Sequence, residues 1–187
     1  MLARDYLPIA LKYYPTDIRE DDSVFLTFLN DARKYTCLKA GIKKQVEFSL
    51  IDGIHRYHLP LNQGIITVML YHSGRWYVLP RKRKDLPYYF SWTGGIEGYY
   101  FDPHTYELVL VGGYPTSQDK LMVEYIVHPV NFMDWEDVEK DIPEHYAELV
   151  GIAYARNLAG YDMNYTVMQF LDGLLIRESS LLQIMRS

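Results

Sequence analysis

Cysteine is almost absent from this sequence, in which Cys37 is the only one among 187 residues. A single cysteine excludes an internal disulfide and is typical of a protein that folds in a reducing compartment. Cys37 lies in an apolar helical pattern, whereas a reactive thiol needs an accessible, electropositive setting. We therefore interpret it as a buried structural thiol and not as a nucleophile.

Long apolar runs are also lacking. No stretch approaches the roughly 18 apolar residues that a helix needs to cross a bilayer. The short apolar run near the N-terminus is interrupted by Asp5, Pro8 and Lys12, and it lacks the small-residue site at which a signal peptide is cleaved. We expect a soluble protein that is intracellular when made and has no membrane partner.

The motifs of common catalytic and metal sites are missing. The sequence contains no HExxH, no GxSxG and no cysteine pair, and its six histidines do not have the spacing of metal ligands. The acidic stretch at residues 134–141 lacks the central glycine of a calcium loop. The glycines of residues 92–98 lie between two strand patterns instead of opening a helix. We expect a protein that is not an enzyme and binds no metal or cofactor.

Positive charge is scarce, because 24 acidic residues outnumber 19 basic ones and the formal net charge is −5. This balance argues against bulk electrostatic capture of nucleic acid. Four basic residues are nevertheless consecutive, and we call them the basic run: Arg81, Lys82, Arg83 and Lys84. Runs of like charge are usually solvated loops, but such a loop also fits DNA phosphates or an acidic protein surface.

Tyrosine, in contrast, is abundant, with 18 in the chain. A tyrosine packs through its ring and hydrogen-bonds through its hydroxyl, which suits interfaces as well as cores. Tyr88 and Tyr89 follow shortly after the basic run, and this composition favours a protein contact there. The same abundance leaves open a β-rich module that binds glycans or peptides in a tyrosine-lined groove.

Hydrophobic periodicity predicts helices towards both ends of the chain and strands between them. Apolar residues recur at helical spacing from Val24 to Tyr35, again after Pro143, and again over about residues 164–182. Alternating apolar residues predict antiparallel strands between them. Three dipeptides mark expected turns: Asp52-Gly53, Ser73-Gly74 and Asp102-Pro103. This order predicts an α+β fold, in which an N-terminal helix and two C-terminal helices form a small bundle with a long inserted antiparallel β-sheet.

The predicted organisation is one structural domain with several parts. Residues 23–44 and 135–182 form the helical bundle, and residues 45–130 form the inserted β-sheet region. Residues 1–22 form an N-terminal arm with weak periodicity, and residues 183–187 form a C-terminal tail.

Four segments carry a resemblance through their order and spacing. They are FLTFLNDARKYTC (residues 25–37), HRYHLPLNQGIITVMLYHSGRWYVLPRKRKDL (55–86), YYFDPHTYELVLVGGYPTSQDKLMVEYIVHPV (99–130) and DIPEHYAELVGIAYARNLAG (141–160). Together they resemble the head-to-tail adaptor, or connector, proteins of tailed bacteriophages. One departure is Gly112-Gly113, which stands where these proteins usually have a proline.

The resemblance implies a structural virion protein of the neck, at the head-tail junction, that is assembled in the host cytoplasm. Such a protein binds the portal ring, extends the DNA channel and docks the next neck or tail component. Its implied partners are therefore the portal protein, the next neck or tail protein, and further copies of itself in a twelve-fold ring. Non-specific contact with the exiting DNA is also compatible with this role.

The resemblance further implies that the C-terminal segment contacts the portal. The candidate portal contact comprises Leu181, Leu182, Ile184 and Met185, whose apolar side chains would be unfavourable in water. The alternative is that these residues complete the third helix on its own core. The basic run, Arg81 to Lys84, is the candidate contact with a neighbouring ring or with DNA in the channel.

Overall fold

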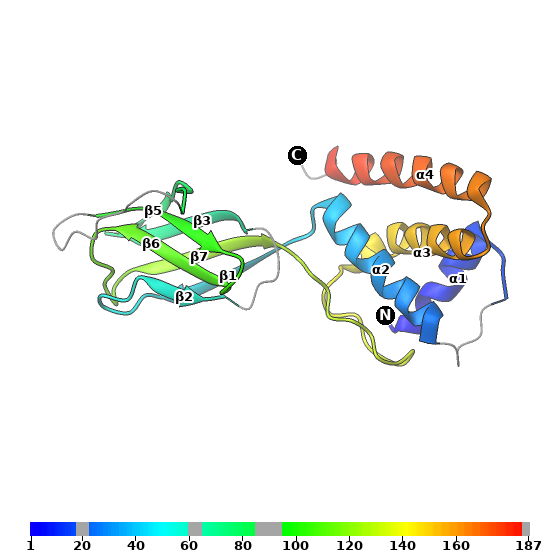
Figure 1. The fold of residues 1–187 in the computed structure, drawn as a ribbon, viewed down its shortest axis with the longest axis horizontal. Coiled ribbons are helices and arrows are strands. Elements are labelled where there is room, and N and C mark those ends of the chain that lie inside the picture. The colour runs from blue at the N-terminus through cyan, green and yellow to red at the C-terminus, as the bar shows by residue number, and fades with distance from the viewer. Residues whose placement is uncertain (18–22, 60–64, 85–94, 185–187) are drawn as a thin grey trace. The chain divides into compact units, whose positions relative to one another are not determined.

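The structure is a computed structural model that describes residues 1–17, 23–59, 65–84 and 95–184. These residues form four α-helices and seven strands, which confirms the α+β class. The chain divides into two compact units, which we call the helical unit (Met1–Ile42 and Val127–Ser187) and the sandwich unit (Lys43–Ile126). Figure 1 shows that the first unit contains the helices and the second contains the strands.

Helix α3 (Ala147–Tyr161) is the centre of the helical unit, where it contacts three other helices. Its side chains are apolar or small around most of its circumference, and a helix of this kind is stable only when other elements surround it. The surrounding helices are α1 (Tyr6–Tyr13), α2 (Ser23–Ala40) and α4 (Tyr165–Ile184). Helices α2, α3 and α4 confirm the predicted N-terminal helix and the two predicted C-terminal helices.

The N-terminal residues form more structure than the arm that the sequence indicated. A 3-10 turn, η1 (Ala3–Asp5), leads into α1, and Tyr6 and Ala10 of α1 are buried in the core of the helical unit. Pro8 is compatible with this helix because it lies in the first turn, where backbone N–H groups have no intrahelical acceptor. With 8 residues, α1 is too short for its apolar residues to establish a recognisable period.

Gly151 determines how closely α1 approaches α3. A Cβ atom at this position would lie 2.3 Å from Ile9 Cγ2, whereas a Cβ atom at Gly173 of α4 would meet no atom within 4 Å. We expect Gly151→Ala to lower the free energy of unfolding by about 1–2 kcal/mol, because the overlap of the new Cβ atom with Ile9 destabilises the fold more than the higher helix propensity of alanine stabilises it. Gly173→Ala should raise it by about 0.5–1 kcal/mol. Denaturant titrations followed by circular dichroism measure both values, and effects of the same sign would contradict this account.

The strands of the sandwich unit form two antiparallel sheets instead of one. The first sheet has the order β1-β7-β3-β4, and the second has the order β2-β6-β5. The strands are β1 (Lys43–Ser49), β2 (Arg56–His58), β3 (Ile65–His72), β4 (Arg75–Val78), β5 (Ile96–Asp102), β6 (Glu107–Gly112) and β7 (Lys120–Ile126). Buried side chains of both sheets, among them Val68, Leu110 and Val123, pack into one core between the sheets.

Two of the three predicted turns join paired strands. Ser73-Gly74 connects β3 to β4, with positive φ values of 51° and 83° that suit a tight hairpin. Asp102-Pro103 begins the connection between β5 and β6. The hairpin predicted at Asp52-Gly53 is wrong, because β1 pairs with β7 and β2 pairs with β6. Gly53 has a positive φ of 72°, a conformation that glycine adopts readily. The turn that contains it connects β1 of the first sheet to β2 of the second sheet and does not form a hairpin.

Candidate partner-binding surfaces

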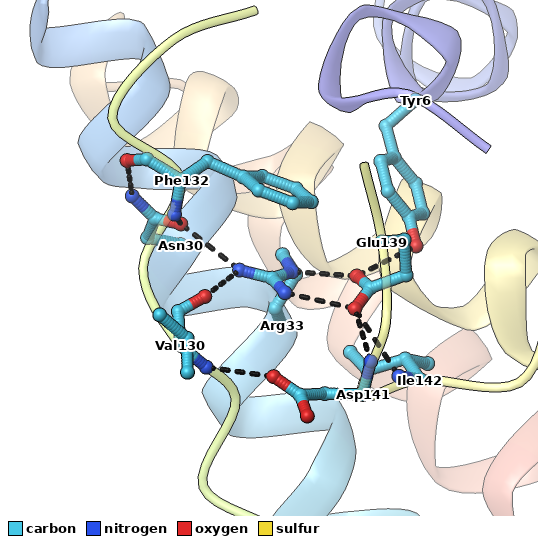
Figure 2. Close-up of polar contacts among 8 residues, drawn as sticks. All are labelled: Tyr6, Asn30, Arg33, Val130, Phe132, Glu139, Asp141 and Ile142. Carbon is cyan, nitrogen blue, oxygen red and sulfur yellow. Dashed lines mark hydrogen bonds and ion pairs between the residues drawn. The ribbon is translucent and has the colours of Figure 1, made fainter. Parts of the chain in front are cut away.

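A buried ion pair holds the irregular segment that follows β7 and precedes the short helix η2 (Glu144–Tyr146). Arg33 of α2 donates from Nε to Glu139 Oε2 at 2.7 Å and from Nη2 to Oε1 at 2.9 Å. Only 1% and 3% of the two side chains are exposed. Two parallel hydrogen bonds between a guanidinium and a carboxylate fix the orientation of both groups, as Figure 2 shows.

The same arginine contacts the segment at a second place. Arg33 Nη1 donates to the carbonyl oxygen of Val130 at 2.7 Å, and the guanidinium carbon lies 3.6 Å from the centre of the Phe132 ring. Asn30, one turn earlier in α2, donates to the Phe132 carbonyl oxygen at 2.9 Å and accepts from its N–H at 2.8 Å. Two side chains of α2 therefore hold residues 130–142 along a defined path that includes neither helix nor strand (Figure 2).

The surroundings of Glu139 keep it ionised. Burial alone would raise the pKa of its carboxyl, but hydrogen bonds from Arg33 and from the N–H groups of Asp141 and Ile142 outweigh burial and hold this pKa below its usual range. Tyr6 donates its hydroxyl to Glu139 Oε2 at 3.2 Å. Burial and the neighbouring carboxylate both raise the pKa of Tyr6. At neutral pH the network thus combines one buried cation, one buried anion and a neutral tyrosine.

The N-terminal residues pair with this segment as well. The N–H of Ala3 donates to the Asp137 carbonyl oxygen at 2.9 Å, and the N–H of Arg4 donates to that of Trp135 at 3.0 Å. The segment nevertheless exposes three apolar side chains, which are Val130, Met133 and Val138. Met133 is 85% exposed. An ordered segment that presents apolar side chains to solvent is suited to contact another protein.

The basic run lies along β5 and not at the tip of a hairpin. The N–H of Lys82 donates to the Tyr99 carbonyl oxygen at 2.6 Å, and the N–H of Tyr99 donates to the Pro80 carbonyl oxygen at 3.1 Å. These bonds give Arg81 a parallel bridge to Tyr99. Because β5 is an edge strand of the second sheet, the run covers part of a sheet edge.

The side chains of the run differ in their surroundings. Lys84 Nζ lies 2.5 Å from Asp102 Oδ2, and this ammonium group together with the N–H of His104 holds the pKa of Asp102 below its usual range. Arg81, Arg83 and Lys84 are exposed, while Lys82 is half-buried. The four residues line a shallow groove of about 380 Å³ with Tyr100 and Phe101. The run is therefore a positioned cationic surface.

Gly98 permits the close approach of the basic run to β5. A Cβ atom at Gly98 would lie 2.5 Å from the Pro80 carbonyl oxygen, whereas a Cβ atom at Gly95 would meet nothing within 4 Å. We expect Gly98→Ala to push the run away from β5 and to speed hydrogen exchange of the Lys82 and Tyr99 amides by about tenfold. Gly95→Ala is the matched control, and it should leave both amides protected. Unchanged exchange in Gly98→Ala would contradict the close packing.

Helix α4 separates the residues of the candidate portal contact. Leu182 is half-buried and packs against the core of the helical unit, whereas Leu181 is 49% exposed. Ile184 is the last residue of α4, and Met185 lies outside the described residues. Leu182 thus belongs to the core of its own bundle, and Leu181 remains accessible to a partner.

The exposed side of α4 carries further large side chains. Phe170 and Ile176 are 63% and 64% exposed, and Tyr165 is exposed as well. At 100° per residue, they and Leu181 lie outside the stripe that contains the buried Leu171 and Leu175, with Tyr165 and Ile176 on one flank and Phe170 and Leu181 on the other. We call Tyr165, Phe170, Ile176 and Leu181 the outer face of α4. Exposed large side chains beside the buried stripe are suited to contact another protein.

Within residues 1–17, 23–59, 65–84 and 95–184, no group of three histidine, cysteine, aspartate or glutamate side chains is placed to hold a metal ion. None of the helices in these ranges combines the length and apolar character that crossing a membrane requires.

The chain matches a known protein family over most of its length. A family model described as SU10 adaptor protein matches residues 2–177. This span includes all described strands and all helices except the end of α4. The residues of the candidate portal contact lie beyond it. No curated protein sequence matches the chain.

Proposed function

The chain belongs to the SU10 adaptor protein family, a family of phage head-to-tail adaptors, and on this premise we propose that it binds the portal ring, extends the DNA channel and docks the next neck or tail component. The observation that supports this proposal is the family match, because it spans both the helical and the sandwich unit. The protein is a component of the virion. We propose that its role is structural and involves no catalysis.

Electron microscopy of the protein mixed with its portal tests the proposal. We expect an additional ring on the portal, with one adaptor copy for each portal subunit and twelve copies on a twelve-fold portal. Portal alone and adaptor alone are the controls that identify this density. A portal that stays bare at saturating adaptor concentration would overturn the proposal.

Within this role, the outer face of α4 is our candidate for the portal contact. It retains Leu181 from the sequence-based candidate and replaces Leu182, which packs inside the helical unit, with Tyr165, Phe170 and Ile176. Burial of such side chains at an interface is favourable by about 1.5–3 kcal/mol each. Asp172 and Arg177 lie beside these side chains, and they already pair with Arg156 at 3.0 Å and with Glu178 at 2.7 Å.

The basic run is our candidate for a second contact, with an acidic surface of a neighbouring protein. Its hydrogen bonds to Tyr99 and its ion pair with Asp102 hold it on a sheet edge, where it is accessible to a protein surface. DNA in the channel is the alternative, and contact with phosphates would carry no sequence preference.

We expect ring assembly to weaken about tenfold at low salt when all four residues of the basic run are replaced by serine, because exposed ion pairs contribute about 0.2–1 kcal/mol each. The effect should be smaller at high salt, since salt screens such pairs. Sedimentation of adaptor with portal at two salt concentrations measures the effect. The charge-matched control carries serine at Lys12, Lys39, Lys43 and Lys120. If the serine variant assembled normally but bound DNA less well, the basic run would be assigned to DNA contact. If neither ring assembly nor DNA binding changed, the run would be a solvated segment.

A further inference from the structure

The sandwich unit contains a cavity that the adaptor role described so far does not use. It has a volume of about 530 Å³ and is lined by residues of β3, β4 and β5 and of the segment before β7. Leu70, Leu79 and Ile96 form apolar walls. A volume of this size with mostly apolar walls is typical of sites that receive a small molecule or a single side chain.

The charged residues of this cavity are acidic. Asp119 and Glu97 line it together with His72, and no lysine or arginine is among the lining residues that the structure describes. Two tyrosines, Tyr77 and Tyr114, line it as well. Carboxylates attract cations directly, and the faces of tyrosine rings attract them through the ring quadrupole. The composition therefore favours a positively charged ligand.

Asp119 is held in place and desolvated. His72 Nδ1 lies 2.7 Å from Asp119 Oδ1, and only 5% of the aspartate side chain is exposed. Asp119 Oδ2 accepts from the N–H of Thr116 at 3.2 Å and from its hydroxyl at 2.9 Å. A carboxylate fixed in this way acts as a preorganised negative charge in the cavity wall and needs no rearrangement when a ligand binds.

Glu97 supplies the second carboxylate from β5. Within the described parts of the chain it forms no ion pair, and its side chain is exposed. Its Cγ atom would lie 2.8 Å from a Cβ atom at Gly112, so the absence of a side chain at Gly112 lets Glu97 lie against β6. Glu97 is thus close to the sandwich and accessible to a ligand head group.

We propose that this cavity binds the side-chain cation of a lysine or arginine that a partner protein presents to it. The apolar walls suit the methylene stem of such a side chain, and the carboxylates and tyrosine rings suit its charged end. The cavity borders β4, whose outer edge is unpaired among the described strands, so an extended partner segment has backbone groups available beside it. This inference rests on the adaptor role, since it names the chemistry of a docking partner.

Nuclear magnetic resonance titration of the full chain tests the inference without any ring or portal. The probes are N-acetyl-lysine-N-methylamide and the arginine equivalent, and the neutral control is the same lysine compound acetylated on Nζ. We expect saturable shifts of the Leu70, Leu79 and Ile96 methyl signals with dissociation constants on the order of 1–10 mM for the two cationic probes. The neutral compound should cause no saturable shift.

Matched variants complete the test. Glu97→Gln should weaken binding of the cationic probes at least about fivefold, because it removes one of two carboxylates. Glu47→Gln, which removes a carboxylate from β1, should leave binding unchanged. The inference would be overturned if the cationic probes caused no saturable shift, or if the neutral probe bound equally well. It would also be overturned if putrescine, a free diamine, bound more tightly than the lysine amide. Ring formation on the portal is measured separately, so either proposal can fail alone.

Discussion

Replacing Arg33 with methionine is expected to lower the free energy of unfolding of the helical unit by about 3–5 kcal/mol, because it leaves the buried Glu139 carboxylate without its partner. The substitution also removes the hydrogen bond to the Val130 carbonyl oxygen and the stacking on Phe132 (Figure 2). Total stabilities of single domains are about 5–15 kcal/mol, so this one change should leave the unit marginally stable. Denaturant titration followed by circular dichroism measures the loss.

Two further variants separate the charge from the packing. Adding Glu139→Gln to Arg33→Met should recover at least about 1 kcal/mol, since no buried charge then lacks a partner and the amide oxygen can still accept from backbone N–H groups. Arg156→Met is the control, because Arg156 pairs with Asp172 in a half-exposed position and such pairs contribute about 0–1 kcal/mol. Equal losses at Arg33 and Arg156 would show that the buried network does not stabilise the fold.

The same network predicts a direction of pH dependence. The pKa of Glu139 in the folded protein lies below its ordinary value, so the ionised carboxylate stabilises the folded state. This stabilisation is complete above the pKa that Glu139 has in the unfolded chain, and it is lost as pH falls through the pKa that Glu139 has in the folded protein. The wild type should therefore lose more stability than Glu139→Gln between about pH 5 and about pH 3.

Substituting aspartate for both Phe170 and Leu181 is expected to reduce affinity for the portal ring about 100-fold or more. Each change removes a large apolar side chain from the proposed interface, which costs about 1.5–3 kcal/mol, and every 1.4 kcal/mol is a factor of ten. Both residues are exposed in the described structure, so the helical unit should stay folded. Surface plasmon resonance on immobilised portal measures the affinity.

The controls for this experiment keep the added charge but change its place. Thr27→Asp together with Gln45→Asp introduces two carboxylates at exposed positions outside α4 and should leave portal affinity within about threefold. Loss of affinity in both proteins would point to net charge as the cause. Full affinity in the Phe170 and Leu181 variant would remove the outer face of α4 from the portal contact.

Local patterns in the sequence were sufficient for much of this protein. The helical spacing from Val24 to Tyr35 predicts α2, and Ser73-Gly74 predicts the hairpin between β3 and β4. The order and spacing of four segments indicated the adaptor family that the family match then showed. These features depend on neighbouring residues, because the period of a helix and the geometry of a tight turn are set within a few positions.

Other features were decided only by the tertiary structure. Arg33 and Glu139 are 106 residues apart, and no local pattern distinguishes Glu139 from the other acidic residues around it. Leu181 and Leu182 are adjacent and equally apolar, yet one is exposed and the other packs in the core, because successive residues of a helix point in different directions. The division of the strands into two sheets likewise depends on pairings such as β1 with β7, which join distant parts of the chain. Composition and spacing determine which elements form, but only packing determines which side chains they bury and which they leave for partners.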